Sequence, residues 1–202
     1  MMEITALQDP LLGPWLDLYQ KSFPLGEQAL VSTHLTEIGQ RACGAQSHAI
    51  HMAATDEDGL FLGLSNWEMV PQTDAAALWY LAVKPTERSR GVGSAMYRHI
   101  ARQCRCCGAR ALVIEVEDPA SCHGSECRAD AERRISFYKR NGACLLSGIA
   151  FTLSVGWQPP MPMSVMIHPF EEMDPDTAFA LCRCILGDGL QQVGALGLEP
   201  QT

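Results

Sequence analysis

The segment that most constrains the fold is an apolar strand that leads through a glycine-containing turn into an amphipathic helix. Residues 76–83 are an unbroken apolar run of strand length, as expected of a strand that is buried on both faces. The following turn, residues 88–94, contains Gly91 and Gly93 and opens a helical pattern. The first turn of a helix has unpaired N–H groups and a partial positive charge, so it attracts phosphate where no bulky side chain intervenes. We call residues 88–94 the glycine turn and predict that it binds phosphate.

Two other phosphate-binding patterns do not fit the glycine turn. A dinucleotide-binding fold needs a third glycine in Gly-x-Gly-x-x-Gly, and a P-loop needs Gly-Lys-Ser/Thr. Neither pattern stands in this segment of the sequence. The plain structural alternative is a helix start that uses its glycines only for a tight turn.

A second informative segment, residues 131–143, is predicted to be a helix that leads into a further strand. The helix contains Tyr138 and is followed by Gly142. A glycine directly after the last helical residues is a common helix stop, because it adopts a left-handed conformation at little cost. The order of the elements is therefore strand, glycine turn, helix, strand, helix, strand.

Together the two segments resemble the GCN5-related N-acetyltransferase (GNAT) superfamily. Its acyl-CoA motif, Arg/Gln-x-x-Gly-x-Gly/Ala, matches Arg88, Gly91 and Gly93. Its later motif, Tyr-x-x-x-Gly followed by an aromatic residue, matches Tyr138 and Gly142, although alanine stands in place of the aromatic residue. The motifs have the order and spacing that the family shows.

The resemblance extends over about residues 3–170 and implies an α/β (α+β) fold. In a GNAT fold, a central mixed, mostly antiparallel twisted sheet of about six to seven strands has helices on both faces. The resemblance also implies a splay between the fourth and fifth strands. We expect a single N-acetyltransferase domain over residues 1–202, in which residues 171–202 form a C-terminal helical extension.

The resemblance implies acetyl-CoA, or another acyl-CoA, as co-substrate and no metal. In the family, backbone groups of the strand before the turn bind the pantetheine arm, and the turn itself binds the pyrophosphate. The predicted acyl-CoA-binding residues are Leu81, Ala82, Val83, Arg88, Ser89, Arg90, Gly91, Val92, Gly93 and Ser94.

Three glutamates are candidates for a catalytic base. Acylation requires a neutral amine, and an alkylamine with a pKa of about 10 is mostly protonated at neutral pH. Glu115 matches the glutamate of the family's Leu-Glu-Val strand, which is the base in some ribosomal-protein acetyltransferases. Glu117 shares its strand face by alternation, and Glu68 lies on the preceding predicted hairpin. The alternative for the first two is a solvated acidic strand face.

Tyr138 receives a catalytic role from the resemblance. The family's tyrosine at this position protonates the departing CoA thiolate. The alternative is a packing role, in which the ring is buried and the hydroxyl group reaches the rim.

The nine cysteines do not form a convincing metal site. Cys104 and Cys107 precede the predicted strand 111–117, whereas Cys122 and Cys127 follow it, so the two pairs are expected at opposite ends of that strand. The odd number of cysteines also argues against a disulfide framework. We therefore predict reduced thiols and no metal.

Residues 118–130 are predicted to be a polar loop that is longer than its counterpart in the family. The loop lacks the asparagine that supports the cofactor there. We expect this loop to shape the choice of acceptor or to act as a lid; the alternative is an ordinary surface insertion.

Charge and hydropathy restrict the partners. A net charge of −8 over 202 residues argues against nucleic acid as the main partner and mildly favours a cationic acceptor. No apolar run reaches the length of about 18 residues that a membrane span needs, and the first residues carry no basic start or apolar secretory segment. We expect a cytoplasmic monomer or homodimer that does not bind membranes.

The predicted function is acyl-CoA-dependent N-acylation. Acetyl would pass from acetyl-CoA to a primary amine of a small molecule or peptide by direct attack in a ternary complex. The alternative is a non-catalytic acyl-CoA-binding sensor or regulatory module of the same fold, which would need the glycine turn but not Tyr138.

Overall fold

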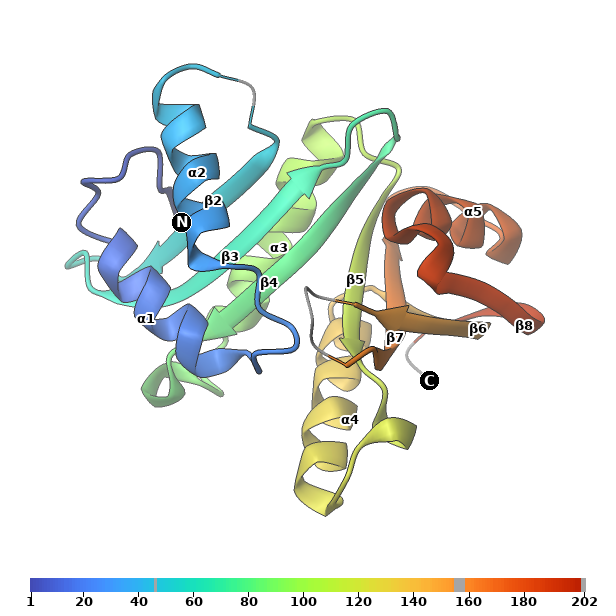
Figure 1. Cartoon of the computed structure of the whole chain (residues 1–202). Helices are drawn as coiled ribbons and strands as arrows, with labels where there is room; N and C mark the ends of the chain where they lie inside the picture. The colour runs from blue at the N-terminus through green and yellow to red at the C-terminus, as the bar shows by residue number, and fades with distance from the viewer. Residues whose placement is uncertain (46, 155–158, 201–202) are drawn as a thin grey trace. The chain divides into compact units, whose positions relative to one another are not determined.

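The structure is a computed structural model that describes residues 1–45, 47–154 and 159–200. The described residues form five α-helices and eight strands (Figure 1). The helices are α1 (Leu12–Ser22), α2 (Val31–Ala42), α3 (Val92–Cys106), α4 (Ser125–Arg140) and α5 (Pro175–Leu186). The strands are β1 (Met2–Glu3), β2 (Ala49–Thr55), β3 (Phe61–Met69), β4 (Ala75–Val83), β5 (Ala111–Glu117), β6 (Cys144–Leu153), β7 (Met161–Pro169) and β8 (Leu190–Glu199). Within these residues, no helix is both long and apolar enough to cross a bilayer.

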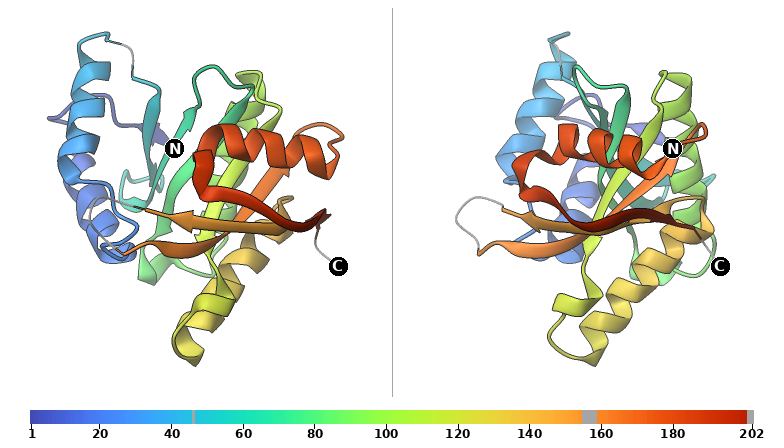
Figure 2. Two further views of the ribbon diagram at one scale, coloured as in Figure 1. Left: turned by 45° about the vertical axis from the view of Figure 1, so that its right-hand side comes forward. Right: turned by 90° about the vertical axis from the view of Figure 1, so that its right-hand side faces the viewer.

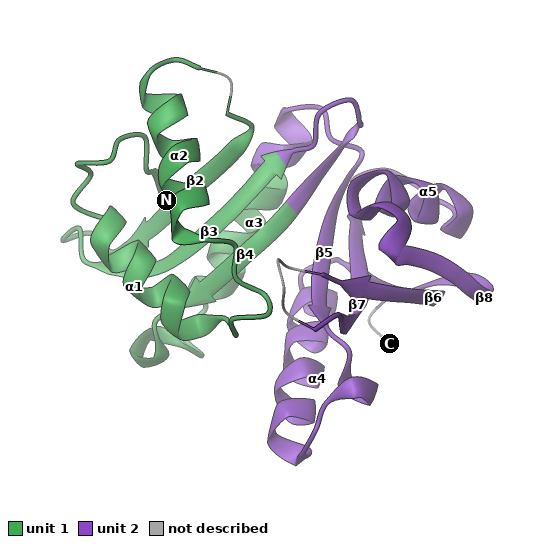
Figure 3. Cartoon of the chain, in the orientation of Figure 1, with its two compact units in different colours: residues 1–68, 78–102 green, residues 69–77, 103–202 purple. Residues whose placement is uncertain are grey.

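The chain divides into two compact units (Figure 3). The first contains residues 1–68 and 78–102, and the second contains residues 69–77 and 103–202. The glycine turn lies in the first unit, and the helix with Tyr138 lies in the second. The splay between the fourth and fifth strands and the single-domain organisation stay predictions.

In the first unit the strand order is β1-β2-β3-β4, and the first three strands pair antiparallel. The hairpin of β2 and β3 has an acidic turn in which the Asp56 carboxylate accepts two backbone N–H groups. In Figure 1, α1 and α2 lie in front of these strands and α3 lies behind them. The core includes Trp15, Ile38 and Leu64, so α1 and α2 are held on the strands by burial of apolar surface.

Two buried histidines interrupt this apolar core. His34 on α2 and His51 on β2 are 2% and 1% exposed, and Nδ1 of His34 lies 2.9 Å from Nε2 of His51. Burial lowers the pKa of His34 to about 4 and, more strongly, that of His51 to about 3. Both imidazoles are therefore neutral at pH 7.

In the second unit the strand order is β5-β7-β6-β8, and all three pairings are antiparallel. Figure 2 shows α5 beside β8 at one end of this unit. The buried face of α5 contributes Ala178 and Cys182 to a core that also contains Val165 and Leu190. The mixed α/β class and the mostly antiparallel pairing predicted from the sequence are confirmed.

Three details differ from the sequence-based expectations. There are eight strands instead of six or seven, and residues 171–202 contain β8 as well as the expected helix. The pairing partner of β8 is β6, more than thirty residues earlier. No local sequence pattern therefore predicts that β8 is a strand. Residues 118–130 are only partly a loop, because α4 begins at Ser125. The first turns of α4 are almost entirely polar and lack the apolar periodicity that predicts a helix.

Gly63 allows β3, β4 and α3 to approach one another closely. A Cβ at Gly63 would lie 2.6 Å from the carbonyl oxygen of Ala82 and 2.9 Å from Sδ of Met96. Neither contact is sterically tolerable for a carbon atom. Since Ala82 precedes the glycine turn and Met96 follows it, this packing holds both ends of the turn.

We expect Gly63→Ala to lower the free energy of unfolding by about 1–3 kcal/mol, because the added methyl group overpacks a filled site. Urea denaturation of the purified chain measures this. The matched control is Gly39→Ala on α2, where the new Cβ would meet only Cδ1 of Leu7 at 3.8 Å. The control should gain up to about 1 kcal/mol, because alanine is the better helix former. A Gly63→Ala variant as stable as the wild type would contradict the close packing.

Candidate active site

The glycine turn presents backbone donors at the start of α3. The first intrahelical hydrogen bond runs from the Ala95 N–H to the carbonyl oxygen of Gly91, at 2.9 Å. The N–H groups of Val92 and Gly93 therefore have no helix carbonyl as partner. Donors of this kind, together with the positive end of the helix dipole, form an anion site.

The turn also has an unusual backbone conformation. Ser89 has φ 61° and Gly91 has φ 82°, and non-glycine residues rarely adopt such left-handed values. Left-handed residues in a turn direct successive N–H groups toward one side, as in anion-binding nests. A Cβ at Gly91 would have no neighbour within 4 Å, so this position faces open space. The residues present fit a bound phosphate.

Positive charge gathers around the turn, although the chain as a whole is acidic. Residues 84–90 contain Lys84, Arg88 and Arg90, with Glu87 as their single carboxylate. Arg90 pairs with that carboxylate at 2.6 Å, and both the Arg88 and Arg90 side chains are exposed. The local charge therefore favours an anionic ligand.

The chain between β4 and the glycine turn is supported by β3. The N–H of Lys84 donates to the carbonyl oxygen of Leu62 at 2.9 Å, so β3 supports the chain just beyond β4. Ala82 is buried, whereas Leu81 and Val83 are partly exposed. These three are the residues predicted to contact the pantetheine arm.

Glu68 stands near the end of β3 with an anchored carboxylate. Its Oε1 accepts a hydrogen bond from Nε1 of Trp79 at 2.9 Å, and its side chain is partly exposed. The indole fixes the direction of this carboxylate and leaves its other oxygen for a further partner.

The second unit brings together Tyr138, Glu117 and Arg134. Tyr138 is buried on α4, and Arg134, one turn earlier, forms an ion pair with Glu117 of β5. Burial raises the pKa of the Tyr138 phenol; the positive charge of Arg134 opposes this effect and the negative charge of Glu117 adds to it. Tyr138 therefore carries its proton at neutral pH.

Glu115 and Glu117 lie opposite Val165 and Met163 of β7, on the same face of β5, as the alternation predicts. Both are partly exposed. Since Glu117 forms an ion pair with Arg134, it is poorly suited to accept a proton. Glu115 and Glu68 keep the candidate role.

Gly142 ends α4 in the predicted way. It has φ 100°, and the N–H of the next residue, Ala143, donates to the carbonyl oxygen of Tyr138 at 3.1 Å. A Cβ at Gly142 would lie 3.0 Å from the ring of His168. The glycine therefore ends the helix and also lets a strand pass close to it.

Sequence reasoning did not single out Arg134. It stands four residues before Tyr138, which places the two on the same helix face, and this spacing was the available signal.

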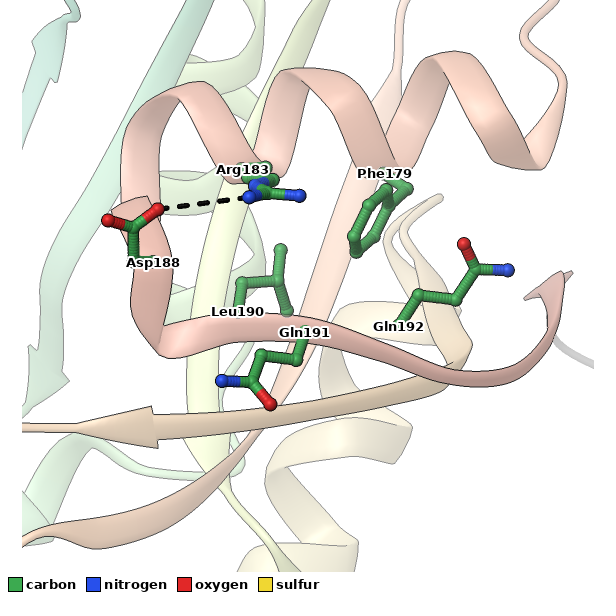
Figure 4. Close-up of a pocket in the computed structure, with 6 residues that line it drawn as sticks. All are labelled: Phe179, Arg183, Asp188, Leu190, Gln191 and Gln192. Atoms are coloured by element: carbon green, nitrogen blue, oxygen red, sulfur yellow. Dashed lines mark ion pairs between the residues drawn. The ribbon is translucent and has the colours of Figure 1, made fainter.

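The second unit also contains an open pocket between α5 and β8, shown in Figure 4 with an ion pair of 3.8 Å between Arg183 and Asp188. None of the predicted site residues lines it. Its lining residues are Phe179, Arg183, Asp188, Leu190, Gln191 and Gln192.

A sequence model of the acetyltransferase (GNAT) family matches residues 13–143. The match includes β4, the glycine turn and all of α4. The comparison with curated proteins gave no match.

Solved structures share the fold. A protein from Bacteroides thetaiotaomicron assigned to the GNAT family has a TM-score of 0.66 and 21% identity, over 87% of this chain and 88% of its own. The ribosomal-protein-S18-alanine N-acetyltransferase of Escherichia coli has a TM-score of 0.58 and 16% identity, over 86% and 96%. A Bacillus subtilis acetyltransferase in complex with CoA has a TM-score of 0.55 and 13% identity, over 79% and 93%. At these identities the likeness shows the fold.

We expect Gly93→Val to weaken the binding of CoA by more than about tenfold, or 1.4 kcal/mol, because the branched side chain would occupy the space in front of the helix N–H groups. Gly93 is a better test than Gly91, whose left-handed φ makes any side chain strained. Calorimetric titration of the folded variant with CoA measures the effect. Ala95→Val, which adds the same side chain at an exposed position of α3, should bind CoA as the wild type does. Unchanged affinity in Gly93→Val would remove the phosphate role of the turn.

Proposed function

Because the chain belongs to the GNAT acetyltransferase family, we propose that it is an acyl-CoA-dependent N-acyltransferase. Its proposed reaction transfers acetyl from acetyl-CoA to a primary amine of a small molecule or peptide by direct attack in a ternary complex. The observation that carries the proposal is the glycine turn: the N–H groups of Val92 and Gly93 have no helix carbonyl as partner, and a Cβ at Gly91 would have no neighbour within 4 Å.

In this proposal the first unit binds the co-substrate. The N–H groups at the start of α3 hold the pyrophosphate, and Arg88 and Arg90 add positive charge. Ser89 and Ser94 flank these donors in the turn. The backbone of Leu81–Val83 pairs with the amides of the pantetheine arm.

The chemical step needs a proton acceptor and a proton donor. As the amine nitrogen attacks the thioester carbonyl, a C–N bond forms and the C–S bond breaks. Glu115, or Glu68 in its place, takes the proton from the amine, and Tyr138 gives its proton to the departing sulfur. The electron pair of the C–S bond leaves with the sulfur, so protons and charges balance.

Arg134 matters for the donor role of Tyr138. Burial keeps the proton on the phenol, but it also makes the phenolate costly. The positive charge of Arg134 lowers the pKa of Tyr138 against the effect of burial, so it reduces the cost of the phenolate that forms during transfer. We therefore regard Arg134 as a positioning and charge-balancing residue.

The direct test measures thiol release from acetyl-CoA with a panel of amines that includes polyamines, aminoglycosides and peptide N-termini. The proposal predicts release that depends on at least one amine. Tight CoA binding without amine-dependent release by any member of a broad panel would favour the sensor alternative.

We expect Tyr138→Phe to lower turnover by about 10²- to 10⁴-fold, the range for a lost general acid, with little change in acyl-CoA affinity. Phenylalanine keeps the buried ring and removes only the hydroxyl group. Steady-state thiol release and calorimetry measure the two quantities separately. Ser136→Ala, at an exposed position of the same helix, is the control and should be as active as the wild type. Equal rates in Tyr138→Phe would assign the proton to water.

We expect Glu115→Gln to lower kcat and to recover activity as the pH rises, since more of the amine acceptor is then neutral without help. The pH–rate profile with one fixed amine measures this. Glu68→Gln is compared in parallel, and a carboxylate that only attracts a cationic acceptor should chiefly change KM. If Glu68→Gln shows the alkaline recovery and Glu115→Gln does not, Glu68 is the base.

A further inference from the structure

Three side chains with metal-binding groups converge between α2 and β2 in the first unit. His34 and Glu37 stand three residues apart on α2, so they share a face of that helix, and His51 lies on β2. Figure 1 shows α2 lying along β2. The cluster has no part in the acylation proposed above, and we call it the His–Glu cluster.

The distances in the His–Glu cluster suit a metal ion. Nδ1 of His34 and Nε2 of His51 are 2.9 Å apart. Oε2 of Glu37 lies 3.5 Å from that nitrogen of His51 and 3.9 Å from that of His34. A triangle with these sides has a centre at about 2 Å from each of the three atoms, which is the usual zinc–nitrogen and zinc–oxygen distance.

Hydrogen bonds alone do not account for the cluster. Nε2 of His51 is approached by Nδ1 of His34, by Nδ2 of Asn66 at 3.3 Å and by Oε2 of Glu37. A ring nitrogen has either one hydrogen or one lone pair in the ring plane, so it makes a single good hydrogen bond. A cation between the three ligand atoms would interact favourably with all three.

The surroundings hold both imidazoles in place. The ring of Trp15 lies 5.2 Å from those of His34 and His51, and the ring of Tyr19 lies 4.6 Å from that of His34. Both histidines are buried, whereas Glu37 is partly exposed. The aromatic rings therefore pack against both imidazoles, and Glu37 is the member of the cluster that solvent reaches.

We propose that His34, Glu37 and His51 form a binding site for a divalent transition-metal ion of the zinc type. Two imidazoles and one carboxylate are a donor set that Zn²⁺ accepts. The bound ion connects α2 to β2, so it stabilises the packing of that helix on the strands. Acyl transfer is not needed for this binding.

The test titrates the full chain, first stripped with EDTA and then desalted, with ZnCl2 in a calorimeter under reducing conditions. We expect one ion per chain and a rise in melting temperature that saturates with zinc, since a ligand that binds only the folded state stabilises it. Co²⁺ in place of zinc should give the visible absorption of a nitrogen- and oxygen-ligated ion without a thiolate charge-transfer band. No binding, or a thiolate band, would overturn the proposal.

Two variants assign the ion to the His–Glu cluster. Glu37→Gln keeps the size of the side chain and should weaken zinc binding by at least about tenfold, with an unchanged circular dichroism spectrum. Glu132→Gln, an exposed carboxylate on α4, is the matched control and should bind zinc as the wild type does. His51→Gln should abolish binding, and if that variant does not fold, Glu37→Gln decides.

Cysteines are the main competing ligands. Cys122 and Cys127 have their sulfur atoms 2.6 Å apart and are free thiols. Cys122→Ser should leave zinc affinity unchanged. Loss of binding in Cys122→Ser with full binding in Glu37→Gln would place the ion at the thiols and overturn the proposal.

Discussion

The close approach of β3, β4 and α3 at Gly63 determines what the glycine turn can do. The missing Cβ lets the Ala82 carbonyl and the Met96 side chain meet the same strand. One of these groups stands before the turn and the other after it. The turn between these two ends has the left-handed conformation at Ser89 and Gly91. A turn whose ends are held loses less entropy when it binds a ligand.

The second unit shows how one ion pair serves a neighbouring group. Arg134 reaches from α4 to Glu117 on β5, and Tyr138 lies one helical turn away. The ion pair holds α4 on its strand and places a positive charge close to a buried phenol. The positive charge of Arg134 lowers the pKa of the Tyr138 phenol, whereas burial and the negative charge of Glu117 raise it.

Local signals in the sequence were sufficient for the main elements. The apolar run of β4, the glycines of the turn and the stop at Gly142 are each visible within a few residues, and the structure has them where they were predicted. Only the resemblance to the family predicts that the turn and Tyr138 serve the same reaction, because no local pattern relates them.

The rest depends on contacts between distant residues. The partner of Glu117 could not be predicted, because it comes from another element. His34 and His51 are 17 positions apart, and no local pattern indicates that two such distant histidines lie side by side. The polar first turns of α4 and the strand β8 were missed for the same reason: their stability comes from packing and pairing and not from their own periodicity.

The pairing of β8 with β6 has a consequence for solubility. Without β8, the free side of β6 would be the edge of its sheet, with a row of unpaired N–H and carbonyl groups that can recruit a strand of another molecule. The strand that takes this place has mostly exposed side chains, among them Gln191 and Gln192. It also contains Gly194 and Gly197, which weaken a strand as a template. β8 thus pairs the edge of β6 with a strand that is itself a weaker template.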